Sequence, residues 1–71
     1  MEVKYTNHAR IQIKRRKFDK VWVEEAIKNP DIIKKEGTKF YAIKRLNGIT
    51  IMVVYVKVKY INIVTVFKIR K

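Results

Sequence analysis

His8 is the only histidine of this 71-residue chain, and Arg16 follows it eight positions later. A histidine can take or give a proton near neutral pH, and an arginine can hold a phosphate through two parallel hydrogen bonds. Cleavage of RNA without a metal needs a proton carrier, together with cations that stabilise the charge developing at phosphorus. The two residue types therefore suit phosphodiester chemistry, while a solvated surface histidine and arginine remain the plainer alternative.

Further cations accompany this pair. Lys14, Arg15, Arg16 and Lys17 are four consecutive cations, which on a helix repel one another and project to different sides. We interpret the run as a patch that follows a nucleic-acid backbone, the alternative being an ordinary solvated surface. Another basic segment, in a predicted turn between two strands, would contact the same backbone through Lys57 and Lys59.

The whole composition points in the same direction. Lysine and arginine number 18 against six aspartates and glutamates, which gives a formal net charge of +12 and a pI near 10.3. An AT-rich genome or a hot habitat could also enrich lysine, but hyperthermophile surfaces enrich glutamate along with it. Because carboxylates are scarce here, we favour a nucleic-acid or phosphate partner.

Other classes of protein are disfavoured. The length fits one domain, residues 1–71, and the absence of cysteine excludes disulfides and thiolate zinc sites. A single histidine and scattered carboxylates argue against a transition-metal site, and we expect no cofactor. The start of the chain does not resemble a signal peptide, and no apolar run approaches the roughly 20 residues of a membrane helix. We expect a cytoplasmic protein that does not enter a membrane.

Two helices are predicted in the first half. Thr6 or Asn7 can cap a helix over about residues 8–16, although the alternation of Ile11 and Ile13 would also fit a strand. Asp19 can cap a second helix over about residues 20–28. Phe18 and Val23 are placed to form a hydrophobic staple across its start, and Asn29-Pro30 ends it.

Four strands are predicted after Pro30. Asn47-Gly48 is a strong signal for a two-residue type I′ hairpin turn. Lys68, Arg70 and Lys71 would blunt an exposed edge at the end of the last strand. We therefore expect an α+β fold in which two short helices pack on one face of a four-stranded antiparallel sheet, and the other face is open to a ligand. The expected strands cover residues 31–36, 39–46, 49–57 and 60–70.

Several short motifs stand in the order and spacing of one known family. They are His8-Ala9, Arg16, Phe18, residues 23–31, Asn47-Gly48, residues 53–55 and residues 64–67. From about Thr6 to Phe67 the chain resembles the family catalogued as domain of unknown function 4258. That family resembles, in its fold, the RelE-like and barnase–EndoU–colicin group of metal-independent ribonucleases, many of which are toxins.

The resemblance implies particular site residues. The family clusters the histidine of its first helix, an arginine of that helix and the threonine of its last strand, which correspond here to His8, Arg16 and Thr65. From the sequence alone, Thr65 in its apolar surroundings would be a packing residue. The family usually has another arginine four residues after the histidine, where this chain has Gln12. This departure bears on catalysis more than on the fold.

Three hypotheses about function follow. The first is RNA binding, in its sharper form a metal-independent endoribonuclease of the toxin type, with His8 as the acid–base group, Arg16 as the phosphate clamp and Thr65 as an orienting hydroxyl. The second is a non-catalytic nucleic-acid-binding or protein-interaction module, which Gln12 favours. The third is a toxin whose basic face is covered by an acidic antitoxin protein.

Overall fold

The first helix begins and ends with hydrogen-bonded caps. A computed structural model describes residues 2–46 and 48–69, and in it α1 spans Asn7–Arg16. Thr6 is its N-cap, because its hydroxyl oxygen accepts a hydrogen bond from the Ala9 amide at 3.1 Å. The helix ends at Lys17, whose φ of 55° lies in the left-handed region. The Phe18 amide then donates to the carbonyl of Ile13 at 2.9 Å, which closes the last turn.

The second helix, α2, spans Lys20–Lys28 as predicted. Its N-cap is Asp19, whose Oδ1 accepts a hydrogen bond from the Val21 amide at 2.9 Å. Phe18 and Val23 are both buried, as the predicted staple requires. The helix ends at Asn29, directly before the proline. The two helices are thus joined by only three residues, 17–19, which contain the cap of each helix.

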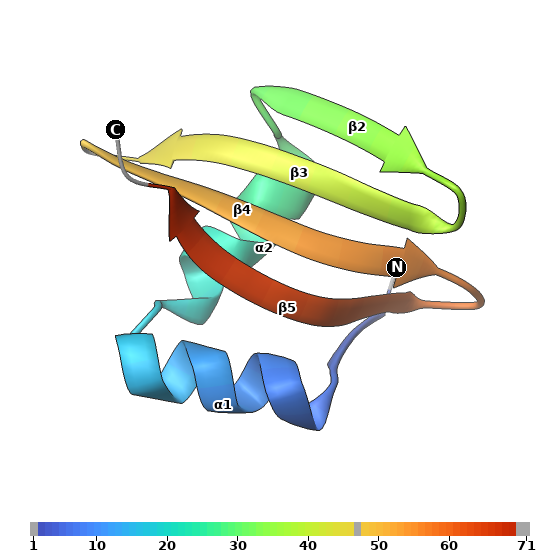
Figure 1. The fold of residues 1–71 in the computed structure, drawn as a ribbon, viewed down its shortest axis with the longest axis horizontal. Coiled ribbons are helices and arrows are strands. Elements are labelled where there is room, and N and C mark those ends of the chain that lie inside the picture. Colours follow the sequence, from blue (N-terminus) through green and yellow to red (C-terminus); the bar gives the residue numbers. More distant parts are fainter. Residues whose placement is uncertain (1, 47, 70–71) are drawn as a thin grey trace.

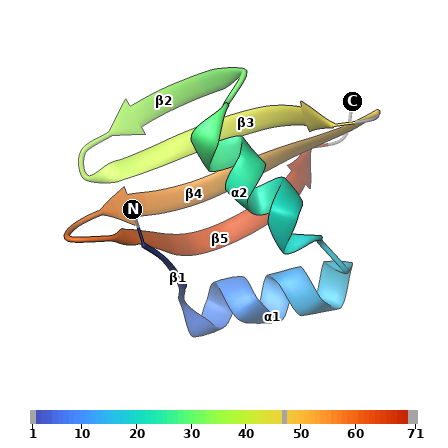
Figure 2. The same ribbon diagram turned by 180° about the vertical axis from the view of Figure 1, so that it is seen from behind.

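Four strands follow α2 and pair in an antiparallel meander. A fifth, shorter strand precedes α1 and pairs in parallel with the last strand, so that the order across the sheet is β1-β5-β4-β3-β2. Figure 1 shows β2 to β5 of this mixed sheet, and Figure 2 labels β1 near the start of β5, at the edge of the sheet. The strands are β1 (Val3–Tyr5), β2 (Ile32–Glu36), β3 (Lys39–Leu46), β4 (Ile49–Lys57) and β5 (Ile61–Ile69).

The prediction of a four-stranded, wholly antiparallel sheet was therefore wrong in one respect. β1 has three residues and is followed at once by the cap of α1, so it is too short to show an alternating pattern. β1 pairs only with Ile61, Asn62 and Ile63, so it covers the first part of β5 and does not reach Lys68. The interpretation of Lys68 as an edge-blunting charge stays a prediction. Arg70 and Lys71, which completed that argument, lie outside the described residues.

The predicted hairpin between β3 and β4 is confirmed. Leu46 pairs with Ile49, which leaves a two-residue connection. Gly48 has a φ of +81°, as the second central residue of a type I′ turn requires. Asn47, the first central residue, lies outside the described part of the chain.

The helices occupy different places on the sheet. α2 crosses one face over β3 and β4, whereas α1 lies alongside β5 at the edge (Figures 1 and 2). Among the described residues no helix covers the other face, as predicted. The centre of that open face is largely apolar, since Tyr41, Met52, Val54 and Phe67 share it by register, and Thr65, the partner of Val54, lies on it as well. That this face receives a ligand stays a prediction.

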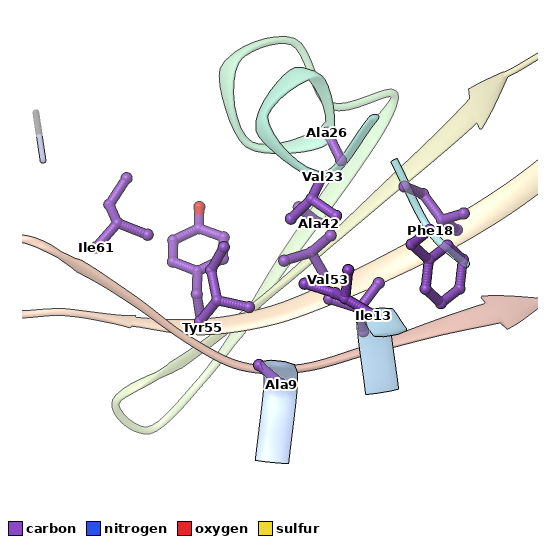
Figure 3. Packing of buried hydrophobic residues seen from close by; sticks show 12 residues of the cluster. Ala9, Ile13, Phe18, Val23, Ala26, Ala42, Val53, Tyr55 and Ile61 are labelled. Atoms are coloured by element: carbon purple, nitrogen blue, oxygen red, sulfur yellow. The ribbon is translucent and has the colours of Figure 1, made fainter. Parts of the chain in front are cut away.

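The hydrophobic core lies between the helices and the sheet. Figure 3 shows α1 contributing Ala9 and Ile13, and α2 contributing Val23 and Ala26, to the same cluster as the inward side chains of β3, β4 and β5. The strand side chains of the cluster are Ala42, Ile51, Val53, Tyr55, Ile61, Ile63 and Val66.

Within residues 2–46 and 48–69, no helix is long and apolar enough to cross a membrane.

Candidate nucleic-acid interface

The position of α1 is fixed by its N-cap residue, Thr6. The Thr6 amide donates to the carbonyl of Ile63 at 3.0 Å, and its hydroxyl donates to the carbonyl of Val64 at 3.0 Å. From there α1 and β5 run side by side in the same direction (Figure 2). A helix advances about 1.5 Å per residue and a strand about 3.3 Å. The start of α1 is therefore level with Thr65, and its end is level with Lys68.

His8 and Thr65 lie at the same end of α1. His8 is the second residue of the helix and is exposed to solvent. Thr65 follows Val64, the residue bonded to the helix cap, and is half-buried. Its hydroxyl oxygen is buried and has no hydrogen-bond partner in the part of the chain that the structure describes. Such an oxygen is uncommon in a folded protein and is often explained by function.

Arg16 lies at the opposite end of α1. Eight residues of helix separate it from His8, a rise of about 12 Å along the axis. The predicted cluster of His8, Arg16 and Thr65 is therefore extended along the helix, not gathered at one point. Gln12 stands between His8 and Arg16, because residues four apart lie on one stripe of a helix. Its side chain is half-buried.

This stripe is on the flank of α1 opposite the flank that carries Arg10 and Lys14. Ala9 and Ile13 face the core, and Arg10 and Lys14 line a hollow together with Lys20 at the start of α2. His8, Gln12 and Arg16 fall on the other flank of the buried positions. Cations therefore lie on both flanks of α1, while Ile11 on its outer surface is apolar and exposed.

Carboxylates do not neutralise these cations. α1 contains four cations and no acidic residue. Within residues 2–46 and 48–69 the structure has a single ion pair, between Lys44 Nζ and Asp31 Oδ1 at 3.8 Å, and it lies far from α1 at the β2–β3 side. Lys14, Arg15, Arg16 and Lys17 are all exposed. The predicted basic patch is therefore a surface of uncompensated charge.

A second hollow, of about 440 Å³, opens where α1 gives way to α2. Two of the residues that line it, Trp22 and Lys68, were not predicted as site residues from the sequence. Lys68 reaches this hollow because a bulge between β4 and β5 changes which side chains of β5 face inward. No pattern in the sequence of β5 predicts that bulge. The hollow is lined by Arg16, Lys17, Phe18, Trp22, Ile49 and Lys68.

Lys57 and Lys59 are not brought to this surface. They lie at the β4–β5 turn, whereas the run of cations lies beside the start of β4 and the end of β5. Eight strand steps separate these two ends, about 26 Å. Both lysines are exposed, and Lys57 Nζ sits 5.4 Å from the ring centre of Phe40. The two predicted groups of backbone contacts are therefore at opposite ends of the molecule.

Two of the tyrosines, Tyr5 and Tyr55, are poor candidates for a general base. Burial, with a smaller effect of the Glu24 carboxylate, raises the pKa of the Tyr5 phenol above its ordinary value. Burial also raises the pKa of Tyr55, which belongs to the core. Both phenols are therefore protonated near neutral pH.

No group of three or more histidine, cysteine or acidic side chains suited to a metal ion occurs among the described residues.

Comparison with known proteins gives one match. The family model described as Domain of unknown function (DUF4258) matches residues 5–68, which run from β1 to the inward lysine of β5. No curated protein and no solved structure matches the chain significantly. The match includes both helices, all of β2 to β4 and the positions of His8, Arg16 and Thr65. The chain therefore belongs to the DUF4258 family.

Proposed function

We propose that this protein binds RNA through the side of the molecule formed by α1 and the end of β5. The observation that carries the proposal is the run of exposed cations at Lys14, Arg15, Arg16 and Lys17, on a helix that has no carboxylate of its own. Uncompensated cations raise the free energy of a small fold by repulsion and raise its affinity for a polyanion. Lys57 and Lys59 would contact the same strand of RNA further along its backbone.

The sharper form of the proposal is a metal-independent endoribonuclease with a RelE-like fold. The 2′-oxygen would attack phosphorus and form a cyclic phosphate while the bond from phosphorus to the 5′-oxygen breaks. His8 would take the proton of the 2′-hydroxyl or give one to the leaving 5′-oxygen, and water would exchange the other proton. Thr65 would orient the reacting groups, and its buried hydroxyl, which lies at the His8 end of α1 without a partner among the described residues, supports that role. Arg16, about 12 Å along the helix, would hold a neighbouring phosphate.

A second candidate is a cytoplasmic module that binds RNA or a protein without chemistry. Gln12 supports it, because an amide between His8 and Arg16 cannot supply the charge of the arginine usual in this family. The same basic side of α1 would also suit an acidic antitoxin, which is the third candidate. Both alternatives use the surface that the first proposal uses and differ from it in the absence of catalysis.

One experiment separates these candidates. The protein is incubated with mixed single-stranded RNA in EDTA, in parallel with the His8→Ala variant, and both binding and cleavage are followed. Cleavage by the unmodified protein but not by the variant supports the ribonuclease. Binding without cleavage supports the non-catalytic module, and Gln12→Arg then tests whether the missing arginine is the reason. The absence of binding at low salt would overturn the proposal of RNA binding itself.

A further inference from the structure

The hollow beside the α1–α2 junction combines charge with an aromatic surface. Its cations come from three segments: Arg16 from the end of α1, Lys17 from the cap and Lys68 from β5. None of the three pairs with a carboxylate in the described ranges. Three like charges around one space repel one another, and a bound anion relieves that repulsion. The same hollow is also lined by Trp22 and Phe18.

Lys17 occupies a backbone conformation that does not favour lysine. Its φ of 55° is in the left-handed region, where glycine is the usual residue at the end of a helix. The cap itself is made by backbone groups, since the Phe18 amide donates to Ile13 and the Lys17 amide to Lys14. The lysine side chain therefore takes no part in the hydrogen bonds of the cap. Backbone strain of this kind is found preferentially at functional sites.

Lys68 breaks the apolar pattern of the inner sheet face. It pairs with Ile51, which is fully buried beneath α2, so the two side chains lie on the same side of the sheet. The inward residues before it on β5, such as Ile63 and Val66, are apolar and buried. A cation at the end of this row points its charge to the mouth of the hollow, where Arg16 also stands.

The two aromatic residues have different roles. Phe18 is only 8% exposed and belongs to the core, so it forms the floor of the hollow. Trp22 is partly exposed and only packs against that core from outside, which leaves part of its ring open. Base stacking on such a ring is sequence-tolerant and is common in proteins that bind single-stranded RNA.

We propose that this hollow binds one nucleotide of a single-stranded RNA, with its phosphate between Arg16, Lys17 and Lys68 and its base against Trp22. The inference rests on the proposed RNA binding and adds the subsite that holds the strand. The hollow, of about 440 Å³, is within the size range of small-molecule sites. It lies at the Arg16 end of α1, so the bound nucleotide would be displaced along the strand from the one beside His8.

Trp22 makes the test direct, because it is the only tryptophan of the chain and its emission reports on the hollow. A labelled ten-nucleotide RNA is titrated at low salt, and RNA anisotropy and tryptophan emission are recorded together. We expect both signals to follow one binding curve. Lys68→Gln and Lys17→Gly should each weaken binding about tenfold, the effect of one charge-assisted hydrogen bond. Trp22→Ala should weaken it by about the same factor, through loss of stacking.

A matched control is Lys34→Gln, which removes an exposed cation from β2 at the far side of the sheet. It should leave the emission change intact and alter affinity much less than Lys68→Gln. If RNA binds by anisotropy while tryptophan emission stays constant, or if Lys34→Gln and Lys68→Gln weaken binding equally, the subsite is wrong and RNA binding stands. If anisotropy shows no binding at all, both proposals fall.

The base is tested separately from the phosphate. Adenosine monophosphate should quench Trp22 at lower concentration than inorganic phosphate, because only the nucleotide stacks on the ring. Equal quenching by the two ligands would contradict the nucleotide assignment and reduce the hollow to an anion site. Lys17→Gly keeps the helix cap, so a weaker response in that variant reports lost charge and not a lost fold.

Discussion

The two helices of this protein are similar in length but differ in how their charges are arranged. α2 carries two lysines and two glutamates, and the carboxylate of Glu25 accepts a hydrogen bond from the side chain of Asn29 at 3.1 Å. α1 carries four cations without a carboxylate and ends at the strained Lys17. Each helix buries two residues completely or nearly so. The difference between them is therefore on their exposed surfaces.

Helix stability alone accounts for the charged residues of α2, but for only some of the charged residues of α1. Cations in the last turn of a helix interact favourably with its dipole, which accounts for Lys14, Arg15 and Arg16 at roughly 0.3–1 kcal/mol each at most. The dipole gives no reason for Arg10, nearer the N-terminal end, or for a left-handed lysine at residue 17. Packing against the sheet accounts for α2, and the proposed RNA binding would account for the remaining cations of α1.

The largest expected effect concerns His8, and it tests whether α1 performs chemistry. His8→Ala should lower the rate of RNA cleavage in EDTA by about 10²–10⁴-fold, the usual contribution of a general acid or base. RNA affinity should hardly change. The matched control is Asn7→Ala, which changes an exposed residue of the same turn. Equal cleavage by the unmodified and His8→Ala proteins would remove His8 from the mechanism.

The next effect concerns charge and compares α1 with β2. Arg15→Glu with Arg16→Glu should weaken RNA binding strongly and flatten the log–log dependence of affinity on salt. Each lost phosphate contact removes about 0.7 from the slope for single-stranded RNA. Lys34→Glu with Lys35→Glu makes the same change in net charge on β2. If both pairs have the same effect, RNA responds to net charge only, and the contrast between the helices has no role in binding.

Thr65→Val is expected to separate stability from activity. Valine has nearly the same shape and removes a buried hydroxyl that has no partner among the described residues. The free energy of unfolding, measured with urea, should rise by about 1 kcal/mol, because the desolvation penalty of the hydroxyl disappears. The cleavage rate should fall if the hydroxyl orients the reacting groups. A stabilised variant with full activity would make Thr65 a packing residue, as its sequence context suggested.

The smallest effects concern the two caps around the α1–α2 junction, and they should have opposite signs. Lys17→Gly should stabilise the fold by roughly 0.5–1 kcal/mol, because glycine adopts the left-handed conformation without strain. Asp19→Ala should destabilise it by about 1 kcal/mol through loss of the hydrogen bond to the Val21 amide. Urea denaturation measures both. A destabilised Lys17→Gly protein would show that the lysine has a structural role after all.

Local signals in the sequence were sufficient for most of the fold. Asp19 marks the start of α2 and Pro30 its end, and Gly48 fixes the hairpin that sets the register of β3 and β4. The three-residue β1 and the bulge at Val54 and Tyr55 depend on pairings distant in sequence, which no local pattern encodes.

The candidate site was less predictable than the fold for the same reason. Thr65 is level with the His8 end of α1 because Thr6 bonds to β5, and Lys68 reaches the hollow because the bulge turns it inward. Residue types indicated what the site could bind. The placement of those residues followed from β1 and the bulge, the two features that the sequence did not reveal.

The central claim is that RNA contacts the α1 side of the molecule, and one measurement tests it without any mutation. The backbone amides are followed by two-dimensional NMR while a ten-nucleotide single-stranded RNA is added at low salt. We expect the largest shifts in residues 7–17 and at Lys68, with small shifts in β2. The account would be contradicted by shifts concentrated in β2 and β3, or by an unchanged spectrum at saturating RNA.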